Sequence, residues 1–317
     1  MSVEILQRAI DLADAKQPFA MLVVLKDAGS TPRKAGTRAV VAGDSSLVGT
    51  IGGGLMESEA RLAAAEAITS RVPVVREFKF GGARAEDNDP CCGGTMRVLI
   101  DPTAAKHRDA YAHAIERLRR RERCLLVTSI GVHVDVQCLA DDAAGFATTT
   151  DTLVERLSPP PLLLIVGGGH VGQALARQAS LLDFEVVLIE DRSEFSDPAR
   201  FPANVTVRCG DVAEQLKQFP LNADTYVALV SRGHRVDARA LGECVKSGAA
   251  YVGMMGSRRK VALVRKMFLE QGLATPEEFD RVHAPIGLDI GADTVPEIAT
   301  SIVAQLVSVR RRATAIR

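Results

Sequence analysis

The sequence predicts an α/β protein of two domains, a mixed α/β domain over residues 1–157 and a doubly wound parallel-sheet domain over residues 158–317. Three observations support this prediction. The 317 residues suffice for about two domains, and the 47% that are hydrophobic suffice for two cores. The segment SPPP, residues 158–161, is typical of a rigid, extended connector. After it, apolar segments alternate with helical ones, as in a parallel sheet covered on both faces.

The first domain is expected to mix short strands with helices. A helix should open the chain, because Val3, Leu6, Ile10 and Ala13 fall on one helical face. Apolar segments bounded by turn residues predict the strands 19–26, 38–43, 74–80, 96–100, 124–130 and 134–140. Further helices are expected at the alanine-rich segment 55–70 and from about residue 107 to 121.

The second domain begins with a strand, a glycine turn, a helix and a second strand over residues 162–192. Further strands are expected over residues 225–231 and 249–257. Thr275 and Glu278 form a capping-box pattern, which predicts the start of a helix.

Charge and hydropathy exclude several classes of partner. Lysine plus arginine and aspartate plus glutamate both number 39, so no global field would attract nucleic acid or a membrane surface. No apolar run reaches the ~18 residues of a membrane span, and the N-terminus lacks the pattern of a signal peptide. We therefore expect a cytoplasmic protein with reduced cysteines. Four of the cysteines are expected to be buried and to pack as small hydrophobic residues: Cys124, Cys138, Cys209 and Cys244.

The glycine turn of the second domain satisfies the G-x-G-x-x-G pattern. Gly167, Gly169 and Gly172 follow an apolar strand and open a helix at His170, and Asp191 ends the next strand. This context predicts a Rossmann fold, with a pyrophosphate at the helix start and ribose hydroxyls on Asp191. NAD(P) or another nucleotide is the expected ligand. The alternative is that the glycines serve only the close packing of helix on strand.

Two segments of the first domain suit a phosphate. The bend formed by Thr50, Gly52, Gly53 and Gly54 leads into a helix, whose start offers free N–H groups and a positive dipole. The second segment is a turn that carries hydroxyl groups and cations, namely Ser30, Thr31, Arg33 and Lys34. Two glycine-rich hairpins with solvated basic residues are the alternative interpretation.

A further polar cluster follows the strand at 225–231. Ser231, Arg232, His234 and Asp237 contain the residue types of a hydrolase triad. A G-x-S-x-G nucleophile elbow is absent, which argues against that chemistry.

Cys91 and Cys92 are adjacent and precede Gly93 and Gly94. In extended backbone their side chains point to opposite faces, so one can face a pocket. Zinc ligation requires separated ligands, and a disulfide between neighbours is strained. One exposed thiol would suit a thiophilic metal or accept a transferred sulfur atom. Two packed cysteines in a turn are the alternative.

Several of these segments together resemble the xanthine dehydrogenase accessory protein (XdhC/CoxI) family. The motifs occur in the family's order: GSTPRKAGTRAVV, GTIGGGLMESEA, CCGGTMRVLIDP, VGGGHVGQALA, DRSEF, SRGH, YVGMMGSRRK and HAPIGLDIGADTVPEIATSIVAQL. The resemblance implies a chaperone that binds molybdopterin, the molybdenum cofactor, supports its sulfuration and delivers it to a xanthine dehydrogenase-like molybdenum hydroxylase. A partner cysteine desulfurase would supply the sulfur, so the chain need not be an enzyme. A homodimer is also implied.

The resemblance assigns roles to the candidate residues. The turn 30–34 and the bend 50–54 would hold the phosphate, and Glu57 would accept hydrogen bonds from pterin N–H groups. Cys92 matches the family's CGG core and would lie near the metal, although Cys91 leaves the reactive thiol open. The rival hypotheses are an NAD(P)-dependent oxidoreductase and a nucleotide-sensing regulator that uses the second domain.

Overall fold

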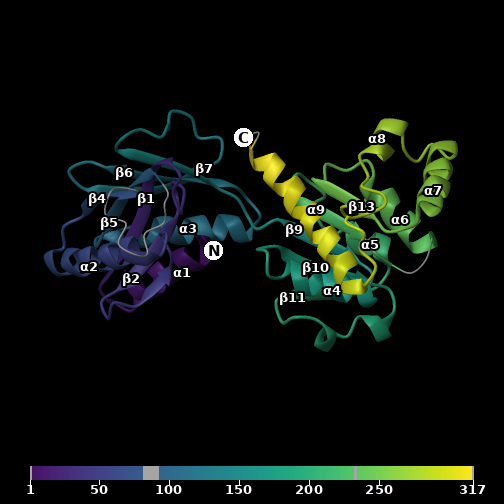
Figure 1. The fold of residues 1–317 in the computed structure, drawn as a ribbon, viewed down its shortest axis with the longest axis horizontal. Coiled ribbons are helices and arrows are strands. Elements are labelled where there is room, and N and C mark those ends of the chain that lie inside the picture. Colours follow the sequence, from purple (N-terminus) through teal and green to yellow (C-terminus); the bar gives the residue numbers. More distant parts are fainter. Residues whose placement is uncertain (1, 81–92, 232–233, 316–317) are drawn as a thin grey trace. The chain divides into compact units, whose positions relative to one another are not determined.

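The protein is described by a computed structural model over residues 2–80, 93–231 and 234–315. The chain divides into two compact units, Met1–Pro159 and Pro160–Arg317, which Figure 1 shows as ribbons. This division lies within the proline-rich connector noted in the sequence. No helix among the described residues is both long and apolar enough to cross a bilayer.

The first unit is built on a five-stranded antiparallel sheet covered on both faces. Its strands, in spatial order, are β3 (Leu47–Gly49), β2 (Arg38–Ala42), β1 (Phe19–Gly29), β5 (Gly94–Asp101) and β4 (Val74–Phe80). Alternate residues of β1 point to opposite faces. Met21 and Val23 pack with α1 (Ser2–Asp14) and α3 (Arg108–Arg119). Leu22 and Val24 pack with the other helix, α2 (Gly54–Ser70).

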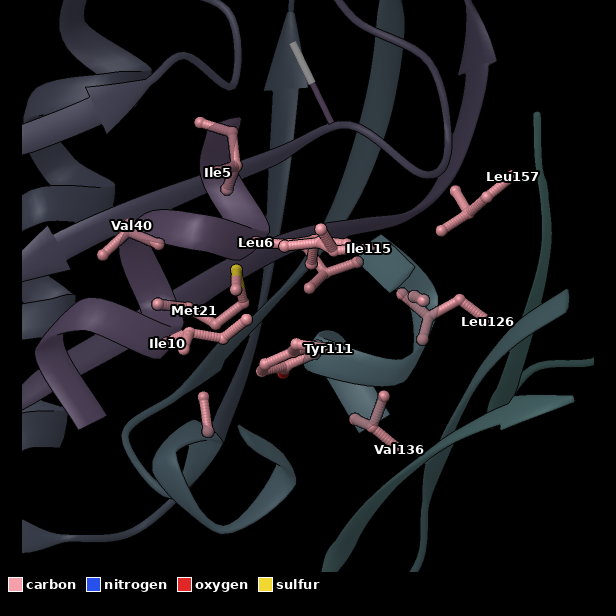
Figure 2. Close-up of a cluster of buried hydrophobic side chains, with 14 of the residues drawn as sticks. Ile5, Leu6, Ile10, Met21, Val40, Tyr111, Ile115, Leu126, Val136 and Leu157 are labelled. Carbon is pink, nitrogen blue, oxygen red and sulfur yellow. The ribbon is translucent and has the colours of Figure 1, made fainter. Parts of the chain in front are cut away.

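A smaller antiparallel sheet adds a further layer beside α3. Its strands, in spatial order, are β7 (Val134–Ala140), β6 (Cys124–Ile130) and β8 (Thr152–Leu157). Figure 2 shows Tyr111 and Ile115 of α3 between the apolar side chains of α1 and the first sheet and those of the second sheet, such as Leu126. The helix expected from about residue 107 is α3, preceded by a 3₁₀ turn at Ala104–His107.

The second unit contains the expected parallel sheet. Its five strands, in spatial order, are β11 (Val205–Cys209), β10 (Glu185–Glu190), β9 (Leu162–Val166), β12 (Thr225–Leu229) and β13 (Tyr251–Met254). One face packs against α4 (His170–Ala179) and α9 (Val295–Ala315). The helices with residues in the core of the other face are α5 (Val212–Leu216), α6 (His234–Cys244), α7 (Arg258–Glu270) and α8 (Pro276–Asp280). Thr275 and Glu278 form the predicted capping box of α8.

Three strands, β3, β8 and β11, were not anticipated from the sequence. All three are edge strands: β3 has only three residues, and β8 and β11 carry exposed polar residues that weaken the apolar signal. The expectation that Cys209 is buried was wrong, because this residue is exposed at the end of β11. Cys138 is half-buried, whereas Cys124 and Cys244 are buried as expected.

Candidate functional site

The turn after β1 lies directly against the start of β5. Gly29 has a φ of 72° and pairs with Gly94 across the sheet. A Cβ atom on Gly29 would lie 2.6 Å from the carbonyl oxygen of Gly93, and one on Gly94 would collide with the carbonyl oxygen of Ser30. Because only glycine permits this approach, the segments around Ser30 and Gly93 are held together by backbone packing.

Within this turn, Lys34 and Arg33 differ in their partners. Lys34 donates to Asp27 over 2.8 Å, and the Ala35 amide donates to the same carboxylate over 2.8 Å. Burial opposes ionisation of Asp27, but these hydrogen bonds outweigh it and lower its pKa. Thr31 Oγ1 donates to the Arg33 carbonyl oxygen. The exposed Arg33 side chain makes no hydrogen bond or ion pair with the described residues and is available to an anion.

The bend before α2 is organised by Glu57. Its Oε2 atom accepts hydrogen bonds from Thr50 Oγ1 at 2.5 Å, from the Ile51 amide at 3.2 Å and from the Gly53 amide at 3.3 Å. Thr50 Oγ1 in turn accepts from the Gly52 amide at 3.1 Å. The acid that was predicted to meet a pterin therefore binds the chain's own loop in this structure.

The bend and the turn are also in contact. A Cβ atom on Gly52 would lie 2.7 Å from Cγ of Pro32, so the two segments lie side by side. Gly53 and Gly54 have φ values of 77° and 63°, and the space beside both is open. Apart from the Glu57 bond to the Gly53 amide, no side chain among the described residues caps the start of α2, and amides in a first helical turn lack intrahelical acceptors. Ligand atoms therefore have access to the backbone here.

The structure thus brings together three segments that the sequence singled out: the turn 30–34, the bend 50–54, and Gly93 with Gly94. The space beside the exposed Gly93 is open. Cys91 and Cys92, the predicted sulfur ligands, lie outside the described residues and immediately precede this glycine in the chain.

In the second unit, close packing accounts for most of the glycine turn. A Cβ atom on Gly172 would collide with the Gly167 carbonyl oxygen, and one on Gly167 would lie 2.7 Å from Cα of Ser231. A Cβ atom on Gly168 would collide with the carbonyl oxygen of Phe195. Gly169, by contrast, borders open space at the start of α4.

The acid that faces this turn is Glu190 rather than Asp191. The Glu190 side chain, 2% exposed, accepts from the Gly168 amide at 2.7 Å and from Arg192 Nε at 2.9 Å. Burial alone would raise the pKa of Glu190, but hydrogen bonds with Arg192, Asp191 and the Gly168 amide lower it to about 2. Asp191 and His170 are exposed. The sequence places both acids at the end of this strand, but only Asp191 was assigned a role, because which of two adjacent acids faces the turn depends on strand register.

The polar cluster after β12 centres on the buried Asp237. Ser231 Oγ donates to one carboxylate oxygen and Lys260 Nζ to the other, each over 2.6 Å. Lys260 also donates to the Met255 carbonyl oxygen. Arg232 lies outside the described residues, as does the side chain of His234. Asp237 is engaged by serine and lysine, so it links α6 and α7 to the strand ends.

Comparisons with known proteins match both units. A family model described as the XdhC and CoxI family matches residues 12–79, and one described as the XdhC Rossmann domain matches residues 163–306. The chain is similar to the uncharacterized protein YqeB of Escherichia coli, with 28% identity over 98% of this chain and 47% of that protein. It is also similar to a probable xanthine dehydrogenase subunit of Bacillus subtilis, with 25% identity over 53% of this chain and 48% of that protein.

The chain therefore spans about half the length of the curated relatives it matches. A solved structure described as a xanthine dehydrogenase from Bacillus halodurans superposes with a TM-score of 0.83 and covers 98% of this chain and 96% of its own. The sequence identity to that structure is 23%, so this similarity bears on the fold alone.

Proposed function

Because the chain belongs to the XdhC and CoxI family, we propose that it takes part in the maturation of a xanthine dehydrogenase-like molybdenum hydroxylase. Its role would be that of a chaperone that binds molybdopterin, supports the sulfuration of the cofactor and delivers it. The observation that supports this most is the convergence of the turn 30–34, the bend 50–54 and Gly93 in one unit.

The residues of the first unit fit a phosphate-bearing ligand in a specific way. Of the two cations in the turn 30–34, Arg33 has no protein partner among the described residues, whereas Lys34 is bound by Asp27. The first-turn amides of α2 would add hydrogen bonds and a favourable dipole. Glu57 already occupies the Ile51 and Gly53 amides, so it would position the bend.

The remaining parts of the proposal concern sulfur and partners. Cys92, or its neighbour Cys91, would contribute a thiolate close to the metal, which supplies the redox chemistry once it is in the client. A partner cysteine desulfurase would provide the sulfur. We further propose that the chain acts as a homodimer in the cytoplasm and is itself a carrier rather than an enzyme.

The test is to purify the full chain anaerobically from a host that makes the cofactor and to measure released pterin by fluorescence and mass. Arg33→Ala should reduce the pterin retained by about tenfold, because it removes a charge-assisted hydrogen bond. Arg76→Ala, at an exposed position of β4, is the matched control. Absence of pterin from the wild type, or equal retention by both variants, would refute the proposed phosphate site.

A nucleotide-sensing role of the second unit is a separate proposal. It is favoured by the exposed Asp191 and by the open space beside Gly169 at the start of α4. Titration with NADH distinguishes this sensor from the alternative, an NAD(P)-dependent oxidoreductase. Saturable binding that alters pterin release supports a sensor, binding with turnover of a carbonyl compound supports an oxidoreductase, and absence of binding removes both.

A further inference from the structure

Two cysteines lie together on the second sheet of the first unit, away from the glycine-rich segments. Cys124 on β6 pairs with Ala140 on β7, and Cys138 lies two residues before Ala140, so the cysteines are diagonal neighbours. Both pack against the same hydrophobic cluster and therefore share a face of the sheet. A hydrogen bond joins their side chains.

Arg117, whose charge acts on the ionisation of both cysteines, has an unused hydrogen-bond donor. Arg117 of α3 binds Glu122 at 3.3 Å through Nη2, and the same atom donates to the Arg123 carbonyl oxygen at 3.5 Å. Its Nε atom is buried and has no hydrogen-bond partner among the described residues. Buried donors of this kind are normally satisfied. An anionic sulfur group beside this guanidinium would provide an acceptor.

The two thiols differ in access and in acidity. Cys124 is fully buried, whereas Cys138 is half-buried and within reach of a small reagent. The hydrogen bond to Cys138, together with burial, raises the pKa of Cys124. The same hydrogen bond lowers the pKa of Cys138. Burial of Cys138 acts in the opposite direction, and the positive charge of Arg117 lowers the pKa further. Asp141, the other charged group that acts on the pair, opposes ionisation of Cys124.

We propose that Cys138 is a second sulfur site, a nucleophilic thiolate that accepts sulfane sulfur from a persulfide, with Cys124 and Arg117 as positioning residues. The Cys138 thiolate attacks the outer sulfur of a donor R–S–SH. A new S–S bond forms on Cys138, the S–S bond of the donor breaks, and R–S⁻ leaves with the electron pair. The products are Cys138–S–SH and R–S⁻, so no external oxidant or reductant is required.

The sheet geometry explains why the product would persist. A neighbouring thiol usually attacks a persulfide and closes a disulfide. Diagonal residues of an antiparallel sheet have Cα atoms about 7–8 Å apart, beyond the ~7 Å limit for a disulfide without backbone movement. Cys124, although hydrogen-bonded to Cys138, is therefore poorly placed to form a disulfide with it.

That the reagent is a sulfur donor rests on the proposed function. The reactivity of Cys138 is argued independently, from its interactions with Cys124 and Arg117. The two are separable by experiment. The Cys92→Ser variant should lose client activation and still gain sulfur at Cys138. Cys138→Ser should lose that modification and still retain pterin.

The first measurement compares alkylation rates by peptide mass on the full, reduced chain treated with iodoacetamide near pH 7. Cys138 should react at least about threefold faster than the exposed Cys209, because the thiolate is the reactive form. Cys124→Ala and Arg117→Gln should each slow Cys138 by a similar factor. Cys209→Ser is the matched control and should leave Cys138 unaffected. Near-ultraviolet circular dichroism checks that each variant is folded.

The second measurement treats the same proteins with inorganic polysulfide. The Cys138 peptide should gain the mass of one sulfur atom, and Cys138→Ser should lose this product. A Cys138 that reacts no faster than Cys209, or whose rate is unchanged in Cys124→Ala and Arg117→Gln, overturns the proposal. A linked Cys124–Cys138 peptide in place of the persulfide would also overturn it.

Discussion

The two glycine-rich connections that lead into α2 and α4 look alike in sequence, but their glycines are required for different structural reasons. At α4, Gly167 and Gly168 before the helix and Gly172 in its first turn are required because a Cβ atom would strike backbone atoms. Before α2, Gly53 and Gly54 border open space and are required by left-handed backbone angles. A glycine motif in one unit is thus explained by packing, whereas in the other it leaves the backbone accessible.

The two connections also have a feature in common: in each, a glutamate side chain accepts hydrogen bonds from amides of the loop. Glu57 lies within the helix it serves and binds the amides of Ile51 and Gly53. Glu190 ends a neighbouring strand, binds the Gly168 amide and is itself held by Arg192. The Glu190 contact ties two elements together, whereas the Glu57 contact shapes one bend. Substitutions should therefore have unequal effects at the two places.

The largest effect is expected from Gly172→Ala. The new Cβ atom would collide with the Gly167 carbonyl oxygen, which cannot retreat without moving the end of β9. Overpacking against backbone should cost about 3 kcal/mol or more. Gly169→Ala is the matched control and should cost less than about 1 kcal/mol, since its space is open. Urea unfolding measures both, and equal losses would contradict the packing explanation.

The next largest effect is expected from Arg192→Met. The change removes the guanidinium from the buried Glu190 and leaves the backbone amides of Gly168 and of residue 192 as donors. Because the Arg192 side chain is 39% exposed, we expect a loss of about 2 kcal/mol, below the full cost for a buried pair. Arg258→Met, at an exposed position of α7, should be nearly neutral. A neutral result for Arg192→Met would show that the ion pair contributes little.

The same pair predicts a dependence of stability on pH. The pKa of Glu190 falls from 4.5 to about 2 on folding. A lowered carboxyl pKa gives stability that is complete above the unfolded value and is lost as the pH falls from 4.5 toward 2. The gap between wild type and Arg192→Met should shrink as urea unfolding is repeated from pH 6 down to pH 4, and a constant gap would exclude this linkage.

A smaller effect is expected from Glu57→Gln in the first unit. The amide oxygen can still accept from the bend, so the loss of stability should be about 1 kcal/mol. If the start of α2 holds a phosphate, removal of the nearby negative charge should also strengthen binding of inorganic phosphate about threefold. Glu59→Gln, exposed on the same helix, is the control. Unchanged phosphate binding would place the anion site elsewhere.

Much of this fold was predictable from local patterns. The buried strands β1, β9, β10 and β12 were anticipated because continuous apolar runs signal strands covered on both faces. The edge strands β3, β8 and β11 were not, since β3 is only three residues long and β8 and β11 expose polar residues that weaken that signal. The same reasoning explains the error at Cys209, which ends such an edge strand.

The candidate site, too, was predictable from local sequence only in part. Residue types and order indicated the turn 30–34 and the bend 50–54, because hydroxyls, cations and glycines before a helix have local meaning. Whether these groups are free depends on partners elsewhere in the chain. Only the tertiary structure showed that Asp27 holds Lys34, that Glu57 occupies the bend, and that Arg33 has no such partner among the described residues.

By itself the sequence determined the fold class, most of the buried strands, the glycine positions and the family to which the chain is similar, because each depends on periodicity or short-range order. The tertiary structure decided which carboxylate faces each glycine turn and which cysteines meet. Glu190 rather than Asp191 binds the loop, and Cys124 reaches Cys138 across two strands. These outcomes depend on strand register and side-chain direction, which bring together residues that no local pattern connects.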